Sequence, residues 1–448
     1  MRITYLIICL LCVTDQVFAQ YNTATMYSNH GDLNIARYFP SKMDIHGNKK
    51  VQIGANYYLY AGNTALNYED LKRINDRKVL ESADIDRFIR SLKKENLFGV
   101  GQDYQVLGLG FQFSTKKGKN FDFSFTAVDK FGASFTYSDN FLKLAWRGNK
   151  QFAGVKTDLG PLRMDVSYTR EFCFGSAFPL IGSENKIGLR GGFRVKYIQG
   201  IASVYVKKSQ ASIFTDTSGR LVTLDLDYNV RAAGLKKFSP LAFSGNGLGI
   251  DLGGTVYLGK NLEIAASVLD IGEVKYTKDA RVFAKKGTFA YEGLIVGNLL
   301  GDPRIEESRD SIQYIFKPQR TGDNSYVMPL STRFIIQAEI KDPRDNGKYG
   351  ERIANAVYIT YAQGLTNLPG TTTRPFVSVG YNHDFHDIFA IGAAASYGGF
   401  NGLALGSFFS LKIAHTLKLG LGSDNLTAFF YKKLGTGIDF SSNFSLSF

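Results

Sequence analysis

Apolar and polar residues alternate with a period of two over several stretches of the chain, most clearly at residues 120–127, 162–169 and 187–197. In the first stretch Phe121, Phe123 and Phe125 fall on one parity, and polar residues fall on the other. Successive side chains of a β-strand point to opposite faces. Each stretch therefore predicts a strand with one apolar face and one polar face.

A soluble sheet and a membrane barrel both alternate in this way, and segment length favours the barrel. The stretches have about ten residues, near the ~9–11 residues of a tilted membrane strand, whereas strands of globular sheets usually have ~5–6. Allowing ~30 residues for each strand and its connection gives about 14 strands, and an even number is expected. The barrel is predicted over residues 50–448. The predicted fold is all-β: a transmembrane antiparallel β-barrel of roughly 14 strands with a short N-terminal helical plug or cap.

Short polar turns separate the predicted strands. Gly259-Lys260-Asn261 is a glycine-bearing hairpin turn between two such strands. Near the end of the chain the pattern predicts six strands in close succession: Phe376–Tyr381, Ile388–Tyr397, Leu403–Ile413, Leu417–Leu421, Leu426–Tyr431 and Gly437–Phe448.

Two segments have helical rather than strand periodicity. Ser82 to Asn96 places Ile85, Phe88, Ile89 and Leu92 on one stripe, with Ser82 or Asp84 as N-cap. Residues 139–146 form a second, weaker candidate. A helix here could fill the lumen, cap a mouth or pack against the rim of the barrel. The polar stretch from Leu300 to Asn324 predicts a loop outside the membrane.

The N-terminus has the pattern of a secretory signal peptide over residues 1–19. Arg2 precedes a short apolar run, and Val17-Phe18-Ala19 is a small-x-small cleavage site. Residues 20–49 are then an N-terminal periplasmic or lumenal segment. Cleavage leaves Cys173 as the one cysteine, so no internal disulfide is expected.

Composition agrees with an exported barrel in the cell outer membrane. The chain has 35 Phe, 25 Tyr and 47 Gly but only 10 Pro, a usage that suits strands and their bends. The formal charge of +13 is dispersed over strands and turns. This favours contact with outer-membrane lipid and lipopolysaccharide rather than with nucleic acid.

Charged residues also stand at polar parity within the predicted strands, where their side chains would face the lumen. Such charges could pair with one another to fill the barrel, or they could form a constriction that selects solutes. The candidates are Arg163, Asp165, Arg190, Arg194, Lys196, Asp225 and Asp227.

Histidines cluster at one place, His383-Asp384-Phe385-His386-Asp387, between two predicted strands. Two imidazoles and two carboxylates could bind a divalent metal or supply a base. However, the sequence offers neither a nucleophile nor a second group of ligands, and a solvated turn is the simpler interpretation. No cofactor and no enzymatic activity are therefore expected.

The last strand carries a feature of outer-membrane barrels. Phe440, Phe444, Leu446 and the C-terminal Phe448 share one parity. This pattern resembles the signal that the barrel-assembly machinery reads, so that machinery is an expected partner.

Three glycine-rich stretches, Ile187 to Ile201, Gly249 to Gly253 and Ala266 to Gly272, resemble strands of a Bacteroidota outer-membrane β-barrel family of undefined function. That family is similar to fatty-acid-transporter-like barrels and to barrels associated with type IX secretion. The resemblance implies the fold and the membrane, and it brings no catalytic residues. Two functions remain open: a transport or channel-type barrel, or a non-conducting structural or accessory component of a type IX secretion, gliding or envelope complex that has a protein partner.

Overall fold

The computed structural model describes residues 26, 32–43, 45, 50–76, 81–116, 119–182, 186–236, 238–292, 317–318, 320–345 and 351–448. The predicted signal peptide lies outside the described residues, as does most of the predicted loop from Leu300 to Asn324.

Fourteen of the described strands form a closed antiparallel ring, as predicted, because β19 at the end of the chain pairs back with β1. Along the rest of the ring each strand pairs with the next. In ring order the strands are β1 (Val51–Asn63), β2 (Glu95–Ser114), β3 (Asn120–Ser138), β5 (Leu162–Gly182), β6 (Ile187–Thr215), β8 (Gly245–Leu258), β9 (Leu262–Tyr276), β13 (Arg333–Asp345), β14 (Glu351–Gly364), β15 (Phe376–Phe385), β16 (Phe389–Gly398), β17 (Leu403–Ile413), β18 (Leu417–Ser423) and β19 (Gly437–Ser447).

The exterior of the ring is apolar and its interior is largely polar. On β15, for example, Val377, Val379 and Tyr381 are exposed, whereas Ser378 and Asn382 are buried. A soluble sheet shows the opposite arrangement, because its polar face meets water. The exposed apolar belt and polar interior are the pattern of a barrel wall between lipid and a wet lumen.

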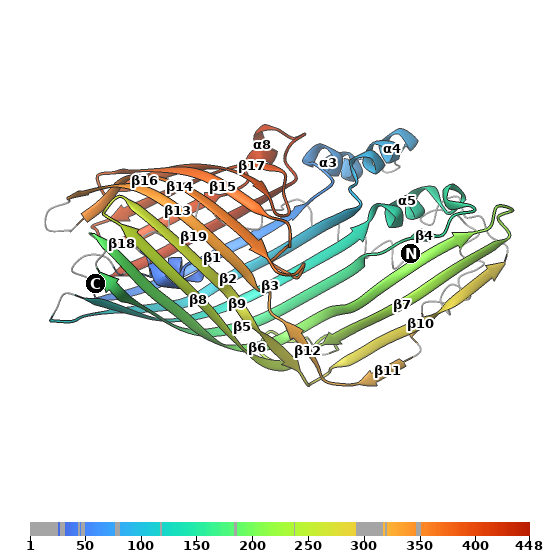
Figure 1. Cartoon of the computed structure of the whole chain (residues 1–448), viewed down its shortest axis with the longest axis horizontal. Coiled ribbons are helices and arrows are strands. Elements are labelled where there is room, and N and C mark those ends of the chain that lie inside the picture. The colour runs from blue at the N-terminus through green and yellow to red at the C-terminus, as the bar shows by residue number, and fades with distance from the viewer. Residues whose placement is uncertain are drawn as a thin grey trace.

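Part of the wall extends beyond the ring as an open part of the same sheet, here called the wing (Figure 1). The first half of β6 pairs with β8 and its second half pairs with β7, so β6 belongs to both the ring and the wing. The wall strands here are longer than the predicted ten residues because they run on into the wing: β6 alone has 29. The wing contains β4 (Thr157–Asp158), β7 (Leu221–Ala233), β10 (Arg281–Glu292) and β11 (Arg320–Asp323), and β12 (Tyr326–Pro329) pairs with the end of β9.

The two ends of the barrel differ. The chain end Phe448 and the short turns at 259–261, 386–388 and 414–416 lie at one end, here called the terminal rim. The wing and most helices lie at the opposite, distal rim (Figure 1). These helices are α3 (Tyr68–Asp76), α4 (Ser82–Ser91), α5 (Asp139–Arg147), η3 (Lys150–Phe152) and α8 (Thr427–Phe430). None of the helices in the described part of the chain has both the length and the apolarity needed to cross a membrane.

Helix α4 ends at Ser91, earlier than the predicted Asn96. The backbone becomes extended at Leu92, and the Asn96 side chain hydrogen-bonds both the N–H and the carbonyl of Lys93. Strand β2 then begins at Glu95. The apolar stripe of α4 packs against the distal helices, with the Phe88 and Trp146 rings 6.0 Å apart. The helix therefore lies at the rim.

The predicted strand Leu426–Tyr431 is wrong, because residues 427–430 form the helical turn α8. The Thr427 hydroxyl accepts a hydrogen bond from the Leu405 N–H at 2.7 Å, and the Leu426 N–H donates to the Leu405 carbonyl. These bonds at the end of β17 bend the chain away from a strand path.

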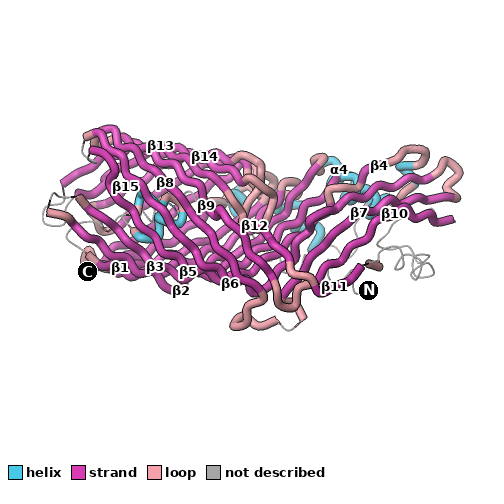
Figure 2. The backbone as a smooth tube through the Cα atoms, turned by 60° about the horizontal axis from the view of Figure 1, so that its bottom comes forward, coloured by secondary structure: helices cyan, strands magenta, loops and turns pink. Residues whose placement is uncertain are grey.

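The lumen contains the N-terminal segment of residues 32–43, here called the plug. It includes two short 3₁₀ helices, η1 (Leu33–Arg37) and η2 (Pro40–Lys42), which are visible inside the ring (Figures 1 and 2). The Asp32 side chain caps η1 by accepting a hydrogen bond from the Asn34 N–H. The predicted fold included such a plug.

Candidate functional site

The plug is held on one side of the lumen by Arg37. Its guanidinium donates to the Asp103 carboxylate of β2 at 2.5 Å and to the Asn56 side chain of β1 at 2.7 Å. A planar guanidinium with several donors suits such a double contact. Close by, the Gln52 side chain of β1 accepts a hydrogen bond from the Leu33 N–H.

Lys42 holds the plug on the opposite part of the wall. Its ammonium lies 2.7 Å from both the Glu263 carboxylate of β9 and the Glu339 carboxylate of β13, and 2.9 Å from the Gln337 side chain. The side chains of Lys42, Glu263 and Glu339 are all at least 95% buried. Lys341 also binds Glu263, at 2.5 Å, so two lysines face two carboxylates.

Arg190 of β6 binds the backbone of the plug. It donates to the carbonyl oxygens of Ser41 and Met43, at 3.0 Å each, and forms an ion pair with Asp122 of β3. The wall leaves room for the plug here: a Cβ at Gly192 would lie 2.4 Å from the Pro40 backbone. Only glycine permits such a close approach of two backbones.

Apolar contacts also hold the plug against the wall. Ile35 and Phe39 of the plug, together with Met26, pack against inward-facing residues of the wall and are buried. These wall residues are Ala265, Leu269, Ile335, Ala362 and Phe376. The plug thus touches the wall through a polar side and an apolar side.

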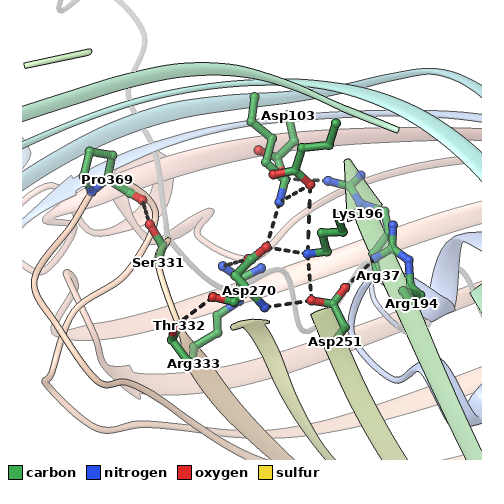
Figure 3. Close-up of polar contacts among 12 residues, drawn as sticks. Arg37, Asp103, Arg194, Lys196, Asp251, Asp270, Ser331, Thr332, Arg333 and Pro369 are labelled. Carbon is green, nitrogen blue, oxygen red and sulfur yellow. Dashed lines mark hydrogen bonds and ion pairs between the residues drawn. The ribbon is translucent and has the colours of Figure 1, made fainter. Parts of the chain in front are cut away.

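A second charged network lies beside the plug, on β6, β8, β9 and the start of β13 (Figure 3). Lys196 contacts the carboxylates of Asp251, at 2.7 Å, and of Asp270. Arg194 binds Asp251 at 3.1 Å, and Arg333 binds Asp270 at 3.2 Å. The buried charges are therefore matched by opposite charges, as burial requires.

A bulge in β9 positions Asp270. The β8–β9 register shifts between Ile250 and Leu252, and Asp270 has φ = 56°. Its freed N–H donates to the Asp251 carboxylate at 2.7 Å, and its carbonyl accepts from the Thr332 hydroxyl. Bulges of this kind redirect a side chain and end strand pairing.

A small cavity of about 90 Å³ lies beside the plug. It is lined by Tyr38 of the plug, by the wall tyrosines Tyr58, Tyr60 and Tyr276, and by charged groups that include Lys130. It can hold several water molecules. Pockets for drug-sized ligands are several times larger, about 300–1,000 Å³.

The other predicted charged residues lie apart from these networks. Asp165 is buried and accepts hydrogen bonds from the Val206 N–H at a bulge in β6 and from Arg163. Asp225 and Asp227 lie in the wing and are partly exposed. They pair with lysines of the wing: Lys156, Lys208 and Lys286. Arg190 thus belongs to the plug contacts. Arg194 and Lys196 belong to the second network, and these four residues belong to neither.

The histidine cluster forms the hairpin turn between β15 and β16. His383 shares a hydrogen bond with Asn355, and His386 and Asp387 have positive φ values of 58° and 60°. Asp387 instead binds His415 and Lys412. Burial opposes ionisation of Asp387, but these two partners outweigh it and lower the pKa of its carboxyl group. No group of three or more His, Cys, Asp or Glu side chains suited to a metal is found among the described residues.

Phe440, Phe444 and Phe448 lie on the exposed outer face of the last strand and its end, and Leu446 is half-buried on the same parity. Phe444 stands opposite Ala55 of β1 and Leu419 of β18. The residues of the predicted assembly signal therefore flank the seam that closes the ring.

The sequence reasoning missed the partners that hold the plug and the second network. Asp251, Glu263 and Glu339 are single acids within apolar strands, at the inward parity. The parity argument that selected Arg194 selects these residues as well, so the signal was present. Arg37 and Lys42 carry no such signal, because the plug has no strand periodicity.

The closed ring, apolar exterior and occupied lumen define the class of protein: a 14-strand β-barrel whose interior is filled by its own N-terminal segment. A sequence model of a family described as "Family of unknown function (DUF5723)" matches residues 47–424, and the chain belongs to this family. A comparison with curated protein sequences gave no match.

Several solved structures are similar over nearly the whole chain. The toluene transporter TodX of Pseudomonas putida has a TM-score of 0.40 at 9% identity, covering 96% of this chain and 94% of that one. A Pseudomonas aeruginosa FadL homologue has 0.43 at 10%, covering 96% and 98%. The TodX deltaS2S3 mutant, a monoaromatic hydrocarbon channel, has 0.45 at 9%, covering 97% and 96%. Because these TM-scores are below 0.5, the fold is assigned from the strand pairing of this chain alone.

Proposed function

We propose that the protein is a non-enzymatic transport barrel of the cell outer membrane, with a lumen that its plug opens and closes. The observation that carries this proposal is the polar attachment of the plug. Arg37, Lys42 and Arg190 bind it at three places around the wall. Ion pairs and hydrogen bonds can be exchanged for water when a plug leaves, whereas a wholly apolar core cannot.

The exposed apolar belt supports the membrane assignment, because contiguous apolar surface of this extent marks contact with lipid. The short turns at the terminal rim match the periplasmic side of such barrels, and the longer distal connections match the outer side. In this orientation the plug enters from the periplasm. Outer-membrane lipid, lipopolysaccharide and the barrel-assembly machinery are the partners we propose.

The predicted links to Bacteroidota and to type IX secretion stay predictions. No feature of the described residues favours an accessory component of a secretion, gliding or envelope complex, and we do not propose that role.

A disulfide that locks the plug tests the proposal. The Ser41 hydroxyl of the plug lies 2.8 Å from the Thr255 hydroxyl of β8. A double variant, Ser41→Cys with Thr255→Cys, would join the two when oxidised, and the native Cys173 is buried. In planar bilayers in KCl, the reduced protein should show opening events, and oxidation should abolish them.

Ser41→Cys alone is the matched control, and its current should not respond to oxidation. Swelling of liposomes in arabinose gives a second readout for an uncharged solute. The transport role would be contradicted by a protein that passes neither ions nor arabinose when reduced. It would also have to show no current after a substitution that removes a contact between the plug and the wall.

A further inference from the structure

The connection between β18 and α8 folds over the inner surface of the wall at the distal rim. A Cβ at Gly406 of β17 would lie 2.6 Å from the Cα of Asp424 and 2.7 Å from the Ser423 carbonyl oxygen. The turn Ser423-Asp424-Asn425 therefore lies against the inner face of β17. All three of its residues are buried.

Asp439 of β19 lies directly beside this turn. One of its carboxylate oxygens accepts the Asp424 N–H at 2.6 Å, and the Ser423 side chain and the Asn425 N–H also bond to this carboxylate. The register places Gly422 opposite Ser441. Two residues further along, Asp424 and Asp439 are neighbours on the same inward-facing parity.

Two like charges side by side on neighbouring strands are unfavourable, and burial raises the cost. Asp424 is 3% exposed and Asp439 is 6% exposed. Asp439 has no ion pair with any residue that the structure describes. Its ionised carboxylate is therefore buried without a compensating positive charge, which is unfavourable. This distinguishes it from the carboxylates of the plug contacts, which each face a lysine or an arginine.

A second observation points to a ligand at the same place. Asn425 is 0% exposed, and neither its Oδ1 nor its Nδ2 atom has a hydrogen-bond partner among the described residues. The second carboxylate oxygen of Asp439, Oδ2, is likewise buried without a partner. Buried polar groups in folded proteins are nearly always satisfied. Asn425 Oδ1 and Asp439 Oδ2 thus offer oxygen atoms on adjoining residues.

We propose that Asp424, Asn425 and Asp439 form a binding site for a hard divalent cation, with Ca²⁺ as the best match. The donor set consists of carboxylate and amide oxygens, which calcium prefers, and it contains no imidazole or thiolate that would favour a transition metal. The ion supplies the missing positive charge and fixes the turn at the distal mouth of the lumen. This site is separate from the plug contacts and goes beyond the proposed transport function.

Terbium luminescence tests the proposal on the full chain. Tb³⁺ replaces Ca²⁺ at oxygen sites, and Tyr60 stands directly opposite Asp439 in the β1–β19 register, so excitation of tyrosine should sensitise a bound ion. The protein is refolded into zwitterionic detergent without lipopolysaccharide, which itself binds cations. We expect saturable luminescence that CaCl₂ displaces with a Kd of about 10⁻⁴–10⁻³ M, the range of extracellular calcium modules.

Asp439→Asn and Asn425→Ala should each weaken Ca²⁺ binding by at least about tenfold. Asp158→Asn, which alters an exposed carboxylate of the wing, is the matched control and should leave it unchanged. Heat-modifiable migration on a gel verifies that each variant forms the barrel. If Asp439→Asn does not form the barrel, the Ca²⁺ binding of Asn425→Ala decides the test. Absence of saturable binding, or binding that survives both variants, would overturn the proposal in favour of a carboxylate that only caps the turn or shares a proton with Asp424.

Discussion

Replacement of Lys42 by methionine should open the lumen. Methionine keeps much of the length of the side chain and removes only the ammonium group, which lies 2.7 Å from Glu263 and 2.7 Å from Glu339. The docked plug would then bury two neighbouring carboxylates with Lys341 as the remaining lysine beside them. In the undocked state these carboxylates are hydrated, so the change penalises the docked state alone.

The expected size of the effect follows from burial. Removal of one partner from a buried ion pair costs about 3–5 kcal/mol. Each 1.4 kcal/mol changes an equilibrium tenfold, so the undocked population should rise roughly 10²-fold to 4 × 10³-fold. The measurement is the fraction of time that single barrels spend open in planar bilayers, and protease cleavage of the N-terminal segment gives an independent readout.

Two further variants make the experiment specific. Lys260→Met removes an exposed ion pair with Glu351 at the terminal rim, and such pairs contribute little, so the open time should not change. Adding Glu339→Gln to Lys42→Met removes one of the two buried charges and should restore part of the docking. If Lys42→Met folds into a heat-modifiable barrel and its open time and protease cleavage equal those of the wild type, the ion pairs do not hold the plug.

Three other predictions concern separate parts of the molecule. Gly192→Ala should also raise the open time, because its Cβ would meet the Pro40 backbone at 2.4 Å, whereas Gly254→Ala adds a Cβ in open space and should have no effect. Phe448→Ser should lower the amount of heat-modifiable barrel in the outer membrane with total expression unchanged, and a normal amount would argue against the assembly signal. The lowered pKa of Asp387 means that its charge stabilises the hairpin above about pH 4, the ordinary range of an Asp carboxyl. That contribution is lost as pH falls through the lower folded pKa, so the melting temperature of Asp387→Asn should converge on that of the wild type in acid.

The fold was predictable to the extent that one face of each strand is buried. Alternation indicated most of the strands, because in a barrel every strand has a lipid face and a lumen face. The count near 14 came from chain length, at ~30 residues for each strand and its connection. The same rule failed to separate wing from ring. Asp225 and Asp227 alternate with apolar residues just as Arg194 and Lys196 do, but β7 pairs with the second half of β6, outside the ring. The branch in β6 follows from strand pairing, which alternation does not encode.

The plug was predictable only as a segment and not as a set of contacts. Its residues have neither a period of two nor a long apolar stripe, and its position is fixed by side chains that lie far away in the sequence. Lys42 meets Glu339 across 297 positions. A local pattern cannot indicate such a pair. The entropy lost in bringing the two residues together is offset by closure of the whole barrel and not by interactions within the plug.

If the plug leaves as proposed, the two interpretations of the lumen charges, a structural filling or a selective constriction, would apply to different residues of the same strand. Arg194 and Lys196 face Asp251 and Asp270 on neighbouring strands of the wall, so their pairing persists whether or not the plug is docked. Arg190 donates to two carbonyl oxygens of the plug, and those donors become free when the plug leaves. Departure of the plug would therefore leave Arg190, paired with Asp122, as a newly exposed cation on the lumen wall. Arg190 would then bind the plug in the closed state and line the solute path in the open state.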